Sequence, residues 1–238
     1  MNFFDRGIIH FLNSFSGRFP LFDHSVAQIS GNSFLNGGVM VALFWWAWNA
    51  KSESQTKRRE YLLFGLIASV GAVFCARFLA LSLPFRLRPM HNPALDFRVP
   101  IGMNPDNLLG WSAFPSDHAS LFFCFATGLW IVSKRLGSIA FAYALFVIAF
   151  PLMYLGAHQP TDIIAGAILG IGLSCLSNVE WLRKGITAPL LRWSDAYSGP
   201  FYAGLFLCSF EIAELFDSVR KIGFTAYRDL ETFLRTLR

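Results

Sequence analysis

Five long apolar stretches, separated by polar segments, dominate the pattern along the chain. They cover residues 33–50, 61–83, 119–132, 138–155 and 163–181. A helix that crosses a bilayer needs about 20 predominantly apolar residues, and the third stretch reaches that length only if the polar residues before it lie at headgroup level. The pattern predicts an all-α fold: a polytopic transmembrane helix bundle with five or six spans, plus in-plane helices at the ends.

The two ends of the chain show weaker patterns. Residues 1–32 carry apolar positions at helical spacing between polar ones, which is typical of an amphipathic helix in the membrane interface. Residues 198–210 form a short apolar run that ends at Glu211 and precedes a basic tail, which favours a re-entrant or in-plane helix, with a sixth span as the alternative. We therefore expect an interfacial segment (1–32), a transmembrane core (33–182) and a C-terminal re-entrant or in-plane segment (183–238).

The composition agrees with a membrane protein. Of the 238 residues, 54% are hydrophobic and 15% are charged, whereas a soluble domain carries about 25% charged residues. The net charge of +5 does not indicate a nucleic-acid partner, because the basic residues gather beside apolar stretches, where they act as topology signals or contact membrane lipids. The four cysteines lie inside apolar stretches, and their spacing suggests neither a metal site nor a disulfide framework. The sequence does not predict an oligomeric state.

The connections between the stretches predict the orientation in the membrane. Lysines and arginines gather at residues 51–59, 134–135 and 183–184, and the positive-inside rule makes that side cytoplasmic. The alternate connections, 84–115 and 156–161, then face the periplasm or the cell exterior of a bacterial inner membrane. Both connections lead into segments that carry a histidine.

The first histidine motif, at residues 114–118, reads Phe-Pro-Ser-Asp-His and stands directly before the third apolar stretch. It places Ser116 at the helix cap, with Asp117 and His118 in the first turn. A helix N-terminus offers free N–H groups and the positive end of the helix dipole, which favour an anion such as phosphate. Ser116 either caps the helix alone or also contacts a bound oxygen.

The second motif pairs His158 with Asp162, four residues later, before the fifth stretch. A carboxylate beside an imidazole can hold its tautomer and raise its basicity, as a histidine nucleophile requires. The alternative is that Asp162 caps the helix and His158 is an interfacial polar residue. A zinc site is disfavoured, because no compact H-x-x-x-H pair or nearby cysteine completes a coordination shell.

Three arginines can supply the positive charge that an anion requires. Arg86 and Arg88 lie in the outer loop, against the topology bias, and Arg77 lies deeper, in the second span. Guanidinium groups suit phosphate oxygens. For Arg77 the alternative is that its side chain only snorkels toward the interface.

Together these residues resemble the type 2 phosphatidic acid phosphatase (PAP2) superfamily, whose pattern is K-x6-R-P, then P-S-G-H, then S-R-x5-H-x3-D. The resemblance covers about residues 60–181 and rests on the sequences Arg88-Pro89 and 115–118, and on the pair His158 and Asp162. It implies a membrane lipid phosphatase in which His158 forms a phosphohistidine and Asp162 orients it. It further implies that His118 protonates the leaving oxygen, that Arg88 and Ser116 bind phosphate, and that no metal or other cofactor is required.

The chain departs from the pattern at three places. Leu81 stands for the lysine, Pro151-Leu152 for Ser-Arg, and Asp117 for glycine. We expect Arg86 first, and Arg77 second, to replace the missing cations. The predicted catalytic residues are His158, His118 and Asp162, and the predicted phosphate-binding residues are Arg88, Arg86, Ser116, Arg77 and Asp117.

The expected substrate is a lipid phosphomonoester or diphosphate. Candidates are a polyprenyl phosphate or diphosphate, phosphatidic acid or a related phospholipid. Two alternatives stay open: a lipid-to-lipid phosphotransferase, and a non-catalytic lipid-binding or transport protein with a degenerate site.

Overall fold

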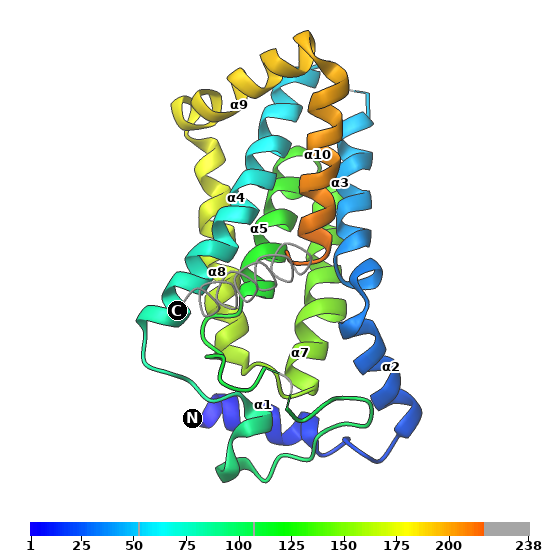
Figure 1. Ribbon diagram of the computed structural model, residues 1–238, viewed down its shortest axis with the longest axis vertical. Helices are drawn as coiled ribbons and strands as arrows, with labels where there is room; N and C mark the ends of the chain where they lie inside the picture. The colour runs from blue at the N-terminus through cyan, green and yellow to red at the C-terminus, as the bar shows by residue number, and fades with distance from the viewer. Residues whose placement is uncertain (52, 107, 217–238) are drawn as a thin grey trace, which may run out of the picture.

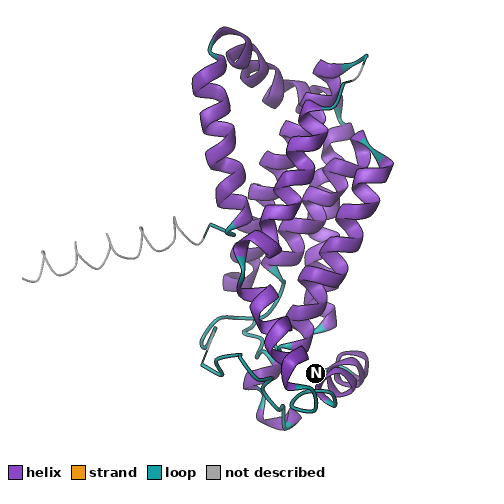
Figure 2. Ribbon diagram, turned by 90° about the vertical axis from the view of Figure 1, so that its right-hand side faces the viewer, coloured by secondary structure: helices purple, strands orange, loops and turns teal. Residues whose placement is uncertain are grey.

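The structure, a computed structural model, describes residues 1–51, 53–106 and 108–216. The α-helices are α1 (Phe3–Asn13), α2 (Pro20–Gly31), α3 (Val39–Asn49), α4 (Gln55–Ser82), α5 (Asp117–Val132), α6 (Lys134–Tyr143), α7 (Phe150–Tyr154), α8 (Pro160–Cys175), α9 (Glu180–Ala196) and α10 (Ser198–Ala213). Two π-helical turns, η1 (Phe34–Gly38) and η4 (Ala144–Ala149), lead into α3 and α7, and short 3-10 turns are η2 (Pro89–His91), η3 (Pro93–Leu95) and η5 (Leu176–Asn178). No strand occurs within the described ranges (Figure 2), so the all-α prediction is confirmed.

Helix α5 forms the centre of the bundle and packs most extensively against α8 and α4 (Figure 1). Glycines allow the close approach of α8. A Cβ atom on Gly166 would lie 2.4 Å from the carbonyl oxygen of Ser116, and one on Gly170 would lie 2.2 Å from that of Ser120. Small residues are the usual means of close helix packing in membranes. This packing brings the N-termini of α5 and α8 together in the lower half of the bundle as drawn in Figure 1.

Three helical segments in the described residues are long and apolar enough to cross a membrane: Gln55–Ser82, Lys134–Tyr154 and Pro160–Asn178. They correspond to the predicted spans at 61–83, 138–155 and 163–181. The predicted third span is the shorter apolar helix α5, and the predicted first span is divided between η1 and α3. The chain is therefore a membrane protein, and five and six spans both stay predictions.

The N-terminal segment contains two helices where the sequence suggested one. The chain turns between α1 and α2 at Gly17, whose φ of +74° favours glycine. Helix α1 runs crosswise beneath the bundle, and α2 rises beside it toward α3 (Figure 1). Helix α1 contacts α7 and α8, so this segment is packed onto the core rather than separate from it.

The C-terminal segment also packs onto the core. Helix α9 crosses the upper end of the bundle, and α10 returns along the bundle beside α3 (Figure 1). Aromatic stacking supports this return, since the rings of Trp48 and Phe201 lie 6.3 Å apart between centroids. Helix α10 follows the bundle axis, which fits the predicted re-entrant element or the sixth span better than an in-plane helix. The predicted basic tail at 217–238 lies outside the described residues.

Candidate active site

A cavity of about 480 Å³ opens where the N-terminus of α5 meets the segment before α8. Five of the eight predicted site residues line it: Arg77, Arg88, Asp117, His118 and His158. His118 and His158, which are 40 positions apart in the sequence, therefore line one cavity. The other three predicted residues, Arg86, Ser116 and Asp162, do not line the cavity.

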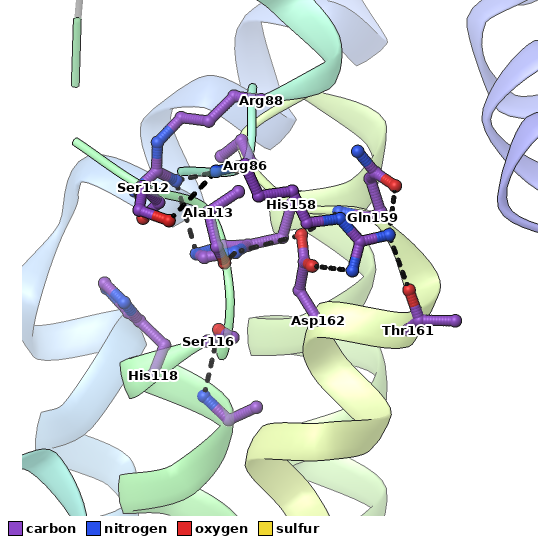
Figure 3. A network of polar contacts seen from close by, with 12 residues as sticks. Arg86, Arg88, Ser112, Ala113, Ser116, His118, His158, Gln159, Thr161 and Asp162 are labelled. Atoms are coloured by element: carbon purple, nitrogen blue, oxygen red, sulfur yellow. Dashed lines mark hydrogen bonds and ion pairs between the residues drawn. The ribbon is translucent and has the colours of Figure 1, made fainter. Parts of the chain in front are cut away.

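His158 is buried, and backbone acceptors hold it in place (Figure 3). Its Nδ1 lies 2.9 Å from the carbonyl oxygen of Ala113. A carbonyl can only accept, so Nδ1 carries the proton of the neutral ring and Nε2 keeps its lone pair. That Nε2 lies 3.4 Å from Nη1 of Arg88, a second cavity residue. The imidazole is thus held in the tautomer that a nucleophilic Nε2 requires.

Asp162 both caps α8 and lies beside the imidazole of His158, the two roles considered for it from the sequence. Its Oδ2 accepts a 2.7 Å bond from the backbone N–H of Gln159, in a capping box at the start of α8. The same oxygen lies 3.7 Å from Nδ1 of His158, which is ion-pair contact but beyond a normal hydrogen bond. Asp162 is therefore foremost a helix cap, placed close enough to the imidazole to act on it electrostatically.

Asp117 connects His118 to Arg77. Its Oδ1 lies 3.0 Å from Nδ1 of His118 and also accepts the backbone N–H of His118 at 2.8 Å. Its Oδ2 forms an ion pair with the guanidinium of Arg77, which lies over the ring of Trp111 at 5.1 Å from the centroid. A carboxylate that accepts at both oxygens orients its neighbours, and the phosphate contact predicted for Asp117 stays a prediction.

Arg88 is a fixed cation in the cavity wall. Nη1 donates to the carbonyl oxygen of Ala157 at 2.7 Å, and Nε donates to that of Trp111 at 3.2 Å. Burial lowers the pKa of Arg88, while Asp117 and Asp162 act in the opposite direction. An arginine pKa begins so far above neutrality that the guanidinium remains charged.

Arg86 faces a different environment from Arg88. Its guanidinium pairs with Asp5 at 2.7 Å and with Asp162 at 2.8 Å, and it donates to the hydroxyl of Thr161 at 2.8 Å. Figure 3 shows it beside Gln159 and Thr161, away from the ring of His118. Arg86 does not line the cavity, whereas Arg77 does. The ranking of these two arginines from sequence is therefore opposite to their placement.

Ser116 acts as the cap of α5. Its Oγ accepts from the backbone N–H of Ala119 at 3.4 Å, and its own N–H donates to the carbonyl oxygen of Asp162 at 3.1 Å. The residue is fully buried and does not line the cavity. It joins the N-termini of α5 and α8, and direct contact with phosphate stays a prediction.

The departures from the PAP2 pattern affect the cavity unequally. Leu81 is 86% exposed on the outer surface of α4, so the substitution there leaves no gap in the cavity. Leu152 is buried and lines the cavity, where it places an apolar side chain in the position of the pattern's arginine. Arg77 is the additional cation that the cavity contains.

Two groups were missed by the sequence analysis. Asp5 was not singled out, although it stands four residues before Ile9 on the buried face of α1, and an acidic residue on an apolar helix face is a recognisable signal. The carbonyl of Ala113 gives no such signal, because every residue has one. Among the described residues, no group of three or more His, Cys, Asp or Glu side chains is placed to hold a metal ion.

Comparison with known proteins places this arrangement in a family. The family model of the PAP2 superfamily matches residues 61–184. Bacitracin transport permease protein BcrC of Bacillus licheniformis is 32% identical over 143 residues, 58% of this chain and 61% of the relative. Lipid A 1-diphosphate synthase of Escherichia coli (strain K12) is 28% identical over 150 residues, 60% of each chain.

A third relative, putative undecaprenyl-diphosphatase YbjG of Escherichia coli (strain K12), is 29% identical over 149 residues, 61% of this chain and 67% of the relative. The aligned part covers about three fifths of the length of the first two relatives. No solved structure gives a significant match.

Proposed function

The chain belongs to the PAP2 superfamily, and from that premise we propose that it is a membrane lipid phosphatase. Its substrate would be a lipid phosphomonoester or diphosphate. The observation that carries the proposal is one cavity in which two imidazoles face two arginines, with Nδ1 of each imidazole bound by an oxygen acceptor. Each imidazole then has its Nε2 left for chemistry.

The chemistry runs in two steps. Nε2 of His158 attacks phosphorus, an N–P bond forms, and the bond from phosphorus to the leaving oxygen breaks as His118 gives that oxygen a proton. Water then attacks the phosphohistidine, His118 takes a proton from the water, and phosphate leaves as the N–P bond breaks. Asp117 orients His118 through the contact with its Nδ1, and Arg88 and Arg77 stabilise the charge on the transferring phosphoryl group.

The orientation predicted from the sequence is supported by the distance between the basic connections and the cavity, which lie toward different ends of the bundle. The starts of α4 and α6, which carry basic residues, and helix α9 lie toward the upper end of the bundle in Figure 1, whereas the N-termini of α5 and α8 lie in the lower half. The cavity is lined by residues at or just before those two N-termini. A cytoplasmic upper end would open the cavity toward the periplasm or the cell exterior. The phosphate of a lipid in the outer leaflet would then reach the two histidines.

The test of this function is a phosphate-release screen with the purified protein over polyprenyl phosphates, polyprenyl diphosphates and phosphatidic acid. We expect release of inorganic phosphate from at least one of them alone. Release that requires a second lipid would instead indicate phosphotransfer. Absence of both release and a labelled His158 would favour the non-catalytic alternative.

We expect the pH dependence of kcat/KM to report His158. Burial lowers the pKa of His158 by more than the nearby Asp162 carboxylate raises it, so the imidazole stays neutral to a pH below its ordinary pKa of about 6.5. Nucleophilic attack needs the neutral form, and activity is therefore lost as the pH falls through the lowered pKa. The acid limb should lie below pH 6.5, and an acid limb above that value would contradict this assignment of His158.

We expect phosphate release to be unaffected by EDTA. Arg77, Arg88 and the N-terminus of α5 would stabilise the charge on the transferring phosphoryl group, and a chelator removes none of them. Vanadate should inhibit, because it mimics the five-coordinate phosphoryl group. Loss of activity in EDTA that zinc or magnesium restores would favour a metal site.

A further inference from the structure

Helix α1 contacts residues next to the active site, although it lies outside the stretch that the family model matches. It precedes residues 61–184, which the family model covers, and it contacts α7 and α8. Its buried residues are Asp5 and Ile9, while Phe3 and Phe11 on its surface are exposed. An aspartate is almost never fully buried unless it is paired, so the surroundings of Asp5 call for an explanation.

Both oxygens of Asp5 bind the first turn of α8. Oδ1 accepts from the backbone N–H of Thr161 at 2.9 Å, and Oδ2 accepts from the Thr161 hydroxyl at 2.6 Å. Thr161 is the second residue of α8, whose first N–H groups have no partner within the helix. Asp5 therefore caps α8 from another helix, at the positive end of the helix dipole.

Arg86 links Asp5 to the histidine site. Its Nη2 lies 2.7 Å from Oδ2 of Asp5, and its Nη1 lies 2.8 Å from Oδ1 of Asp162. The two carboxylates are fully buried and share this one guanidinium. The other oxygen of Asp162 lies 3.7 Å from Nδ1 of His158. A continuous series of polar contacts, ionic as far as Asp162, thus runs from α1 to the proposed nucleophile.

We propose that Asp5 is a positioning residue, which fixes Arg86 so that the Asp162 carboxylate keeps its place beside His158. Without the charge of Asp5, Arg86 has Asp162 as its remaining carboxylate and draws it away from the imidazole. The effect of Asp162 on His158 then weakens. The inference rests on the proposed function for its readout, since it concerns the rate at which His158 reacts.

The variant Asp5→Asn tests this role, because it keeps the shape and one acceptor oxygen but removes the charge that faces Arg86. We expect kcat to fall about 10- to 100-fold, the usual weight of a hydrogen bond to a charged group, with little change in KM. The acid limb of kcat/KM should move to lower pH, because Asp162 raises the pKa of His158. A variant with the wild-type kcat and pH profile would overturn the proposal.

A double-mutant cycle separates positioning from general destabilisation. If Asp5 acts through Arg86, then Asp5→Asn combined with Arg86→Gln should cost no more kcat than Arg86→Gln alone. Multiplied losses would contradict the linkage. The matched control is Asp23→Asn, which alters another fully buried aspartate, one that accepts from the N–H groups of Gly17 and Ile101. It should lower the melting temperature and leave kcat unchanged.

Chemical rescue covers the case in which Asp5→Asn does not yield folded protein. Asp5→Ala leaves the space of a carboxylate, and added formate should restore part of kcat, whereas chloride at the same ionic strength should not. Equal effects of the two anions would overturn the positioning role. A wild-type protein that releases no phosphate would instead contradict the proposed function, so the two failures are distinguishable.

Discussion

His158→Ala is expected to abolish phosphate release. The substitution removes the Nε2 proposed to attack phosphorus, and the loss of a nucleophile lowers turnover by on the order of 10⁵-fold or more. It should also remove the acid-labile phosphoenzyme that a labelled lipid phosphate produces in the wild type. The measurement is inorganic phosphate release together with labelling of the purified protein, quenched in alkaline detergent so that the N–P bond survives.

His118→Ala and His91→Ala complete this experiment. His118→Ala should still accumulate the phosphoenzyme with substrates that have good leaving groups, because these need little protonation. His91 lies in the outer loop, where its Nε2 meets the carbonyl oxygen of Pro105 at 2.9 Å, and His91→Ala should retain activity. Full activity in folded His158→Ala would remove the basis of the proposed mechanism.

The second large effect concerns Arg77. We expect Arg77→Ala to lower kcat/KM by about 10²- to 10³-fold, comparable to the loss of one preorganised donor to a developing charge. Two losses combine in this variant: the cavity loses a cation, and Asp117 loses the partner of its Oδ2. Steady-state kinetics with the best substrate from the screen provides the measurement.

The inhibitor vanadate distinguishes Arg77 from Arg86. Arg77 lines the cavity, so Arg77→Ala should weaken vanadate inhibition along with catalysis. Arg86→Ala should lower kcat through Asp162 while the affinity for vanadate changes little. Arg98→Ala is the control, since that guanidinium meets the carbonyl oxygen of Ser16, outside the cavity. Normal kinetics in Arg77→Ala would show that the cavity works with Arg88 alone.

The sequence was sufficient for the all-α fold and for singling out the two histidine motifs, because both depend on local signals. Apolar stretches predict membrane helices wherever they are long enough, and motifs at helix N-termini carry their position with them. His118 and His158, singled out in this way, line one cavity in the structure, and their roles stay predictions. The division of the N-terminal segment at Gly17 was not predicted, since the apolar spacing continues across it.

The ranking of Arg86 above Arg77 shows what the sequence could not provide. Arg77 was ranked second because it lies deeper in the second span, where side chains lean toward the N-terminus of the helix and away from the outer face. In the structure Asp117, the first residue of α5, forms an ion pair with Arg77, which lies five residues before the end of α4. The cavity therefore lies beside Arg77 and not at the end of α4. The relative position of α4 and α5 along their axes and the direction of the Arg86 side chain both depend on tertiary packing. Neither can be predicted from the order of residues in the sequence.

Part of the cavity wall comes from outside the stretch that the family model covers. His118, His158, Arg77 and Arg88 belong to the stretch that the family model covers. Ser30 at the end of α2, Asn36 in η1 and Glu214 after the end of α10 line the same cavity from outside that stretch. The approach of η1 to α10 is so close that a Cβ on Gly37 would lie 2.4 Å from Cα of Ala213. Seven of the eighteen lining residues thus lie outside the family match, and a substrate range taken from the family alone would leave their contacts with the substrate out.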